Sequence, residues 1–297
     1  MKPQQTILAS LSFLTVTCMS AAAAEDARLA AATPAIEATI RQSGADVGIA
    51  FQTLDARCSW FVGADEPFHA ASTMKVPVLI ELYRQVHEGK LRLADTLVLR
   101  NEFPSLIDGS AFSLNAADDS EAGLYAAIGS SRTLGQLSEL MITVSSNFAA
   151  NLLIGKLGVE NIRSTVHALG ADGMQVRRRL EDSKAFQLGI NNTTTARALG
   201  RLMEAIALGQ AVDQESSRRM REVLERQTFN DGIPAGVPAG IRVAHKTGDI
   251  TRIQHDAAIV YGPRPFVLVV LTRGISDQKD GYALIATITR QLYAATE

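Results

Sequence analysis

The sequence predicts an α/β (α+β) fold, in which N- and C-terminal strands form one antiparallel sheet flanked by helices around an inserted all-helical domain. Runs of β-branched and aromatic residues near 47–62 and 242–272 are typical of strands. Between them, apolar residues recur at three- and four-residue intervals, which is the spacing of amphipathic helices. Because both ends supply strands and the middle supplies helices, we expect the two ends to share one sheet.

The first 24 residues have the pattern of a secretory signal peptide. Lys2 gives a positive start, residues 7–19 form an apolar stretch, and residues 21–24 are alanines before Glu25. The stretch is short for a bilayer span, although a membrane-anchoring helix is the alternative. We therefore expect a periplasmic or secreted protein without stable membrane association, whose mature chain begins at Glu25.

Composition argues against several classes of partner. The 29 Lys and Arg nearly balance the 31 Asp and Glu, and the basic clusters 177–179 and 218–221 have acids nearby, so no nucleic-acid partner is expected. Cys58 alone would remain after removal of the leader, which indicates a buried thiol rather than a disulfide. The five histidines lack metal-ligand spacing, so we expect neither a metal nor another cofactor. Without heptads, a monomer is expected.

The N-terminal elements follow from local patterns. An Ala-rich helix is expected over 26–42, ended by Gly44. Residues 47–53 and 58–62 have the composition of a β-hairpin. From Ser72 onward the apolar spacing becomes helical.

The rest of the chain alternates between regular and irregular segments. Residues 98–131 are irregular, and 170–192 form a long polar loop of the kind that is usually functional or disordered. Further helices are expected at 134–144 with Thr133 as N-cap, 147–156, 196–208 after Thr193-Thr194-Thr195, 213–227 and 280–294, and further strands at 242–246, 257–261 and 266–272. We expect residues 25–70 and 230–297 to form the sheet domain, and 71–229 the helical domain.

Ser72-Thr73-Met74-Lys75 is the first group of residues suited to chemistry. Positions three apart share a helix face, so the lysine amine can reach the serine hydroxyl. Serine alone is a weak nucleophile, and a lysine whose pKa is lowered by burial or by positive neighbours can accept its proton. The pattern is common by itself and needs support elsewhere in the chain.

Ser145-Ser146-Asn147 lies between two expected helices. A hydroxyl there could relay a proton toward a leaving nitrogen, and the asparagine amide could hold a substrate amide. Taken alone, the triplet indicates only a helix N-cap.

Lys246-Thr247-Gly248 ends an apolar strand. An edge strand of this composition can pair with an extended substrate and bind a carboxylate at its side. Taken alone, the triplet indicates only a strand end followed by a turn.

Together and in this order, Ser-x-x-Lys, Ser-x-Asn and Lys-Thr-Gly are the motif set of penicillin-recognising serine enzymes. Over essentially its whole mature length the chain thus resembles the class A β-lactamases and their serine-hydrolase relatives. The resemblance implies a β-lactamase/transpeptidase-like fold, a small-molecule β-lactam substrate and hydrolysis through an acyl-enzyme.

The resemblance also implies a role for each residue of the first two motifs. Ser72 would be the acylated nucleophile, and Lys75 its proton partner. Ser145 would pass a proton to the lactam nitrogen, while Asn147 would bind the side-chain amide of the substrate.

The third motif would bind the rest of the substrate. By resemblance, Lys246 and Thr247 would hold the substrate carboxylate, with Gly248 beside them in the strand. The backbone N–H groups of Ser72 and Asp249 would form the oxyanion hole, and one such donor is typically worth about 100- to 1,000-fold in rate.

Glu181 distinguishes a hydrolase from a dead-end acyl acceptor. It follows Arg179 in the long loop, where the family has the glutamate that activates the deacylating water. The alternative is a solvated loop acid beside Asp182. Asn151, one turn beyond Asn147, matches the family asparagine that supports this loop, and Arg179 matches the arginine that pairs with the end of the loop.

Three positions depart from the family pattern. Ala185 stands where an asparagine commonly helps to hold the water, and Asn191-Asn192-Thr193 stands where Arg179 usually finds an aspartate. Ser146 replaces the usual aspartate of the second motif, and 98–131 is longer than in typical members. These departures concern efficient hydrolysis more than acylation.

Other functions remain as alternatives. A D-alanyl-D-alanine carboxypeptidase or an esterase could use the same scaffold, although Glu181 argues against the carboxypeptidase. Ser72 lacks the flanking glycines of a nucleophile elbow, which disfavours an α/β-hydrolase. A non-catalytic lactam sensor would need membrane and signalling segments that this sequence does not suggest.

Overall fold

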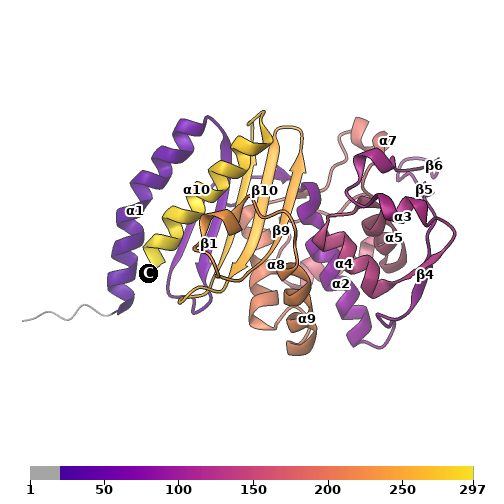
Figure 1. Ribbon diagram of the computed structural model, residues 1–297, viewed down its shortest axis with the longest axis horizontal. Coiled ribbons are helices and arrows are strands. Elements are labelled where there is room, and N and C mark those ends of the chain that lie inside the picture. Colours follow the sequence, from indigo (N-terminus) through magenta and orange to yellow (C-terminus); the bar gives the residue numbers. More distant parts are fainter. Residues whose placement is uncertain (1–20, 297) are drawn as a thin grey trace, which may run out of the picture.

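The computed structural model describes residues 21–296 and has the predicted fold class (Figure 1). One five-stranded sheet has the strand order β2-β1-β11-β10-β9, and all its neighbours are antiparallel. The strands are β1 (Asp46–Thr53), β2 (Ser59–Val62), β9 (Val243–Ile250), β10 (Ile253–Val260) and β11 (Phe266–Arg273). Because β1 pairs with β11, the prediction that the two chain ends share a sheet is confirmed.

The sheet separates two hydrophobic cores, because successive side chains of a strand point to opposite faces. The inner core lies between the sheet and the helical part of the molecule, and the outer core lies on the opposite face of the sheet. In β11, Val267 and Val269 belong to the inner core, whereas Phe266 and Leu268 belong to the outer core. Both faces are therefore apolar, which explains why β11 is a continuous hydrophobic run in the sequence rather than an alternating one.

Two terminal helices cover the outer face. Helix α1 (Ala21–Ser43) and helix α10 (Gln278–Thr296) pack against each other, and Figure 1 shows the two helices side by side there. Ile36 of α1 and Ile285 of α10 are fully buried in this core. Cys58 is buried in it as expected. The expected apolar stretch of the leader, residues 7–19, lies outside the described residues.

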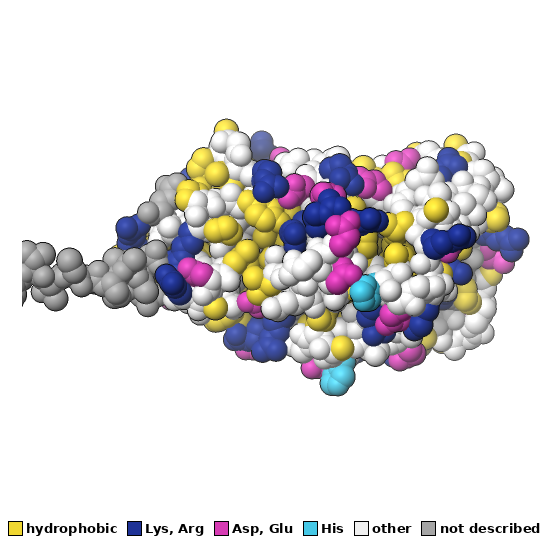
Figure 2. Space-filling view, turned by 90° about the horizontal axis from the view of Figure 1, so that it is seen from below, with side chains coloured by type: hydrophobic (Ala, Val, Ile, Leu, Met, Phe, Trp, Pro, Cys, Tyr) yellow, Lys and Arg dark blue, Asp and Glu magenta, His cyan; other side chains and the backbone are white. Residues whose placement is uncertain are grey.

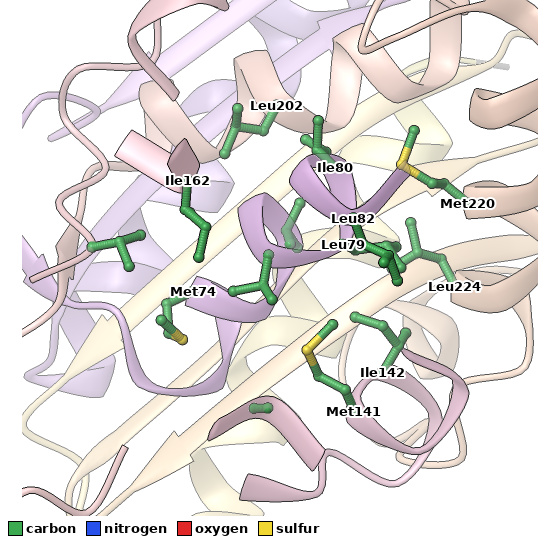
Figure 3. Close-up of a cluster of buried hydrophobic side chains, with 14 of the residues drawn as sticks. Met74, Leu79, Ile80, Leu82, Met141, Ile142, Ile162, Leu202, Met220 and Leu224 are labelled. Atoms are coloured by element: carbon green, nitrogen blue, oxygen red, sulfur yellow. The ribbon is translucent and has the colours of Figure 1, made fainter. Parts of the chain in front are cut away.

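The helical part of the molecule lies beyond the inner face of the sheet (Figure 1). Its main helices are α2 (Lys75–His87), α4 (Leu134–Thr143), α5 (Asn147–Leu157), α6 (Val159–Ala168), α8 (Ala196–Leu208) and α9 (Gln214–Glu225). Helix α8 packs directly on the sheet, while α2 runs through the middle, and Figure 3 shows Leu79 and Leu82 of α2 among Met141, Ile142 and Leu224. Because α2 is surrounded by apolar neighbours, its first residue has a rigid support.

Two helix starts follow the expected capping chemistry. Thr133 and Gln136 form a reciprocal capping box at the start of α4. Thr195 accepts a hydrogen bond from Ala198 N–H at the start of α8. The remaining short elements are β3 (Phe68–His69), η1 (Ala71–Met74), β4 (Thr96–Val98), β5 (Phe103–Pro104), β6 (Ala111–Phe112), η2 (Ala116–Asp118), α3 (Ala122–Ala126), β7 (Ser131–Thr133), α7 (Ser183–Gln187), β8 (Thr193–Thr194) and η3 (Ile233–Gly236).

The structure corrects the sequence prediction at three elements. Ser72 lies in the 3₁₀ turn η1, and the α-helix begins only at Lys75. Helix α6 occupies residues for which the sequence pattern suggested no element; Gly158, at φ 84°, separates it from α5. The long loop is partly ordered, since it contains α7. The two-domain division stays a prediction.

Charges on the surface are interspersed. Figure 2 shows basic and acidic side chains mixed on one face of the molecule. In the basic cluster 218–221, Arg218 pairs with Glu215 and Glu222, and Arg219 pairs with Glu215. Between residues 21 and 296, no helix is long and apolar enough to cross a bilayer.

Candidate active site

A cleft of about 760 Å³ brings the three motifs together. Ser72 of η1, Ser145 and Asn147 from the α4–α5 corner, and Thr247 and Asp249 of β9 line it. Helix α10 forms a further wall, which the sequence analysis did not anticipate. Residues that are distant in the sequence thus meet at the edge of the sheet, where β9 faces the helical part.

Ser72 and Lys75 are in direct contact. Lys75 Nζ lies 2.9 Å from Ser72 Oγ, because residues three apart are eclipsed in a 3₁₀ turn. The same ammonium or amine nitrogen lies 2.6 Å from the Ser145 carbonyl oxygen and 2.7 Å from Asn147 Oδ1. The side chain of Lys75 therefore connects Ser72 of its own motif with the second motif.

The environment of Lys75 favours its neutral form. Its side chain is fully buried, and burial lowers the pKa of Lys75 well below its usual value, assisted by the charge of Lys246. Asp119 and Glu181 act in the opposite sense. A neutral amine at hydrogen-bond distance from a serine hydroxyl can accept its proton.

Ser145 connects the two lysines. Its hydroxyl oxygen lies 3.1 Å from Lys75 Nζ and 2.9 Å from Lys246 Nζ. Burial lowers the pKa of Lys246 to about 7. Ser145 has a φ of 60°, a strained conformation for a residue other than glycine, which turns the corner between α4 and α5 toward the cleft.

Gly248 allows β9 to approach the nucleophile closely. A Cβ at this position would lie 3.0 Å from Thr73 Cγ2, 3.2 Å from Ala71 Cβ and 3.2 Å from Ser72 N. A larger residue would push the strand away from η1. The glycine of the third motif is thus required by the short distance between β9 and the backbone of Ser72.

Glu181 faces the second motif but is exposed. Its Oε1 accepts a hydrogen bond of 3.1 Å from Asn147 Nδ2, and the other end of that amide accepts from Lys75. The residue has a φ of 62°. The chain just before it is fixed by buried Asn151, whose amide bonds Leu180 N at 2.8 Å and Leu180 O at 2.9 Å. The expected contact between Asn151 and the loop is present.

The expected contact of Arg179 with the end of the loop is made instead by its neighbour. Arg178 donates to the Ile190 carbonyl at 2.8 Å and to Asn191 Oδ1 at 3.0 Å, whereas Arg179 Nε is buried without a hydrogen-bond partner. Arg178 is the more buried of the two and points back across the loop. The supporting role expected for Arg179 stays a prediction, and its spacing did not indicate that the neighbouring Arg178 reaches the end of the loop.

The other departures have clear structural consequences. Asn192 Oδ1 accepts from the backbone N–H groups of Arg177 and Arg178, so an amide closes the base of the loop without an ion pair. Ala185 is fully buried and offers no polar side chain to a water. Ser146 is the N-cap of α5.

Two carboxylates connect irregular segments with the site, although the motifs indicated no role for either of them. Asp182 is buried and accepts from Ser105 Oγ and Leu106 N, which ties the Glu181 loop to the irregular segment 98–131. Asp119, in the same segment, contacts the second motif. No pattern of neighbouring residues in the sequence indicates either contact. In the part of the chain that the structure describes, no group of three or more His, Cys, Asp or Glu residues could hold a metal ion.

Comparison with known proteins identifies the family of the chain. The family model described as "Beta-lactamase enzyme family" matches residues 31–296. A β-lactamase of Bacillus licheniformis is 32% identical over 170 residues, 55% of each chain, and one of Mycobacterium tuberculosis is 27% identical over 266 residues, 79% of this chain and 80% of the relative. The chain thus aligns with about half the length of the first of these relatives.

Two solved structures have the same fold. A β-lactamase from Sphaerobacter thermophilus superposes with a TM-score of 0.76 at 29% identity, over 91% of this chain and 97% of its own. A protein named PBP-A superposes with a TM-score of 0.75 at 30% identity, over 89% and 94% of the two chains. The chain belongs to the beta-lactamase enzyme family.

Proposed function

We propose that the protein is a serine β-lactamase, in which Ser72 opens the lactam ring and water activated by Glu181 releases the product. The observation on which the proposal depends is the 2.9 Å contact between Ser72 Oγ and the buried nitrogen of Lys75. The Bacillus and Mycobacterium relatives carry the name β-lactamase, which supports this substrate class.

In the proposed acylation, neutral Lys75 takes the proton of Ser72 as the hydroxyl oxygen attacks the lactam carbonyl. The carbonyl oxygen receives hydrogen bonds from the backbone N–H groups of Ser72 and Asp249, and the C–N bond then breaks. Ser145 is suited to protonate the leaving nitrogen, because its hydroxyl contacts both Lys75 and Lys246. Lys246 and Thr247 would bind the carboxylate of the substrate.

In the proposed deacylation, Glu181 removes a proton from the water that attacks the ester. A positioned general base contributes about 100- to 10,000-fold to such a step. Glu181 is exposed and reaches Lys75 through the amide of Asn147, and Ala185 gives the water no side-chain partner. We therefore expect deacylation to be slower than acylation.

A penicillin-binding carboxypeptidase or esterase on the same scaffold is the second candidate. The exposure of Glu181 favours it, because a base that is not fixed against the nucleophile leaves a long-lived acyl-enzyme. The similarity to PBP-A is compatible with it. We further propose that the protein acts outside the cytoplasm, as its leader-like N-terminus suggests.

Intact-mass measurement after mixing with benzylpenicillin separates the candidates. A β-lactamase gives a transient mass increase on Ser72 that decays as penicilloate appears, and Ser72→Ala gives none. Glu181→Gln should accumulate the adduct. A wild-type adduct that persists for hours would favour the penicillin-binding candidate, and absence of both adduct and penicilloate would exclude both.

A further inference from the structure

Asp119 contacts the second motif from a distant part of the chain. It lies between η2 and α3, in the irregular segment, and its side chain is half-buried beside Asn147 in the lining of the cleft. One carboxylate oxygen, Oδ2, accepts hydrogen bonds from Phe148 N at 2.8 Å, Tyr125 Oη at 2.9 Å and Ser146 Oγ at 3.3 Å. Three donors from two separate segments thus converge on one atom.

These donors belong to the start of helix α5. The first N–H groups of a helix have no partner within the helix, and Phe148 N is one of them. Ser146, the N-cap, accepts from Ala149 N at 3.2 Å while donating to Asp119. A negative charge at a helix N-terminus is also favoured by the helix dipole. The carboxylate therefore completes a cap that the serine alone leaves incomplete.

We propose that Asp119 is a positioning residue for acylation, which supplies from the irregular segment the carboxylate that the second motif lacks at Ser146. Asn147, the first residue of α5, accepts from Lys75, and Ser145 comes just before the cap. Fixing the start of α5 thus fixes both residues that hold Lys75 against Ser72. The inference rests on the proposed acylation of Ser72.

Tyr125 keeps the carboxylate in place. Burial, and then the charge of Asp119, raise the pKa of Tyr125 well above its usual value, so the phenol remains a hydrogen-bond donor. The charged groups that act on Lys75 are Lys246, Asp119 and Glu181. Asp119 thus also affects the protonation of the base, in the direction that favours the charged amine.

The test exchanges the two side chains. Asp119→Ser should slow single-turnover acylation by benzylpenicillin about 10- to 100-fold, the usual size for loss of charge-assisted hydrogen bonds. Adding Ser146→Asp returns the carboxylate to the motif, and the double variant should recover to within about threefold of wild type. Glu121→Gln, which removes a charge from the same segment while retaining an acceptor for Gly123 N, is the matched control and should acylate normally.

The pH dependence provides a readout that a purely structural role would leave unchanged. Asp119→Asn removes the negative charge but keeps an acceptor oxygen, so the pKa of Lys75 should fall. The acid limb, which is the part of the pH profile where the acylation rate decreases on acidification, should therefore move to lower pH. An unchanged rate in Asp119→Ser, or a double variant as slow as the single one, would overturn the inference.

Crystal structures make this test independent of the proposed function. In Asp119→Ser, the side chains of Ser145 and Asn147 should move away from Lys75, and in the exchanged variant they should return. A corner that stays in place in Asp119→Ser overturns the inference, whether or not the wild type is acylated. A wild type that forms neither adduct nor penicilloate overturns the proposed function alone.

Discussion

At the residue scale, the cleft concentrates conformations and charges that are unfavourable in a folded protein. Lys75 and Lys246 are fully buried, and Ala71, Ser145 and Glu181 have positive φ angles of 44°, 60° and 62°. Each such backbone conformation costs about 1–3 kcal/mol, so the surrounding structure must hold them in place. Their grouping around one serine indicates a site shaped for reactivity rather than for stability.

The acylation rate should depend on pH through Lys75. The lysine acts as a base only when neutral, so the rate should fall as pH decreases through its lowered pKa. Lys246→Met removes the neighbouring positive charge and should raise the pKa of Lys75, which moves the acid limb to higher pH. Below about pH 7, where Lys246 is charged, the difference should be largest. Single-turnover acylation rates measured by stopped flow at saturating substrate provide the test. An acid limb that moves to lower pH in Lys246→Met would contradict the prediction.

Gly248→Ala should impair acylation without unfolding the protein. The new methyl group would meet three groups of η1 at 3.0–3.2 Å, so β9 must shift by a few tenths of an ångström. Small displacements of reacting groups cost up to about 100-fold in rate. We expect a slower acylation with a melting temperature within a few degrees of wild type. Gly240→Ala, at a position with open space around the new Cβ, controls for loss of glycine, although its φ of 87° adds local strain.

The sequence was sufficient to predict the site residues that short motifs specify, but not those that only the fold brings together. Ser72 and Lys75 were found because a three-residue spacing places them together in any helical turn. Asp119 was not, because its contact with Ser146 spans 27 residues and depends on how the irregular segment folds over α5. Arg178 and Arg179 differ only in direction, which no spacing reveals.

At the element scale, two irregular segments support the site together. Asp182 of the Glu181 loop accepts from Ser105 Oγ at 2.9 Å and from Leu106 N at 2.8 Å. On the surface, Lys184 pairs with Asp108. The loop is consequently held by the segment 98–131 on one side and by Asn151 of α5 on the other. The sequence indicated both segments only as irregular, because their order comes from contacts between them.

Asp182→Asn should loosen the loop in a pH-dependent way. Burial raises the pKa of Asp182, but hydrogen bonds from Leu106, Ala185 and Ser105 outweigh it, and the pKa falls below 3.8. The ionised carboxylate thus stabilises the folded state above about pH 4, and this contribution is lost as pH falls through the lowered pKa. We expect the variant to be about 1–3 kcal/mol less stable at pH 7.

Urea unfolding from pH 3 to pH 7 measures this effect. The difference between wild type and Asp182→Asn should shrink toward pH 3. Asp108→Asn, which breaks an exposed ion pair of the same two segments, should behave like wild type. A difference that is constant with pH would show that packing rather than ionisation anchors the loop.

At the scale of the whole molecule, the sheet separates a core that supports the chemistry from one that joins the chain ends. Leu79 is fully buried one turn after Lys75, in the inner core, where Figure 3 shows it on α2. Ile36 is fully buried in the outer core on α1, a helix absent from the described lining of the cleft. The sequence predicted a sheet flanked by helices, but not which face of the sheet holds the site.

Leu79→Ala and Ile36→Ala should therefore differ in function while agreeing in stability. Each removes a fully buried aliphatic side chain and should cost about 2–5 kcal/mol in the free energy of unfolding, measured with urea. Acylation at 20 °C should slow in Leu79→Ala, because the cavity lies beneath the helix that holds Lys75. It should stay near the wild-type rate in Ile36→Ala, since the sheet lies between that cavity and η1. Equal slowing in both variants would mean that the two cores respond as one unit, and that the precision of the site depends on the whole molecule rather than on α2 and its neighbours.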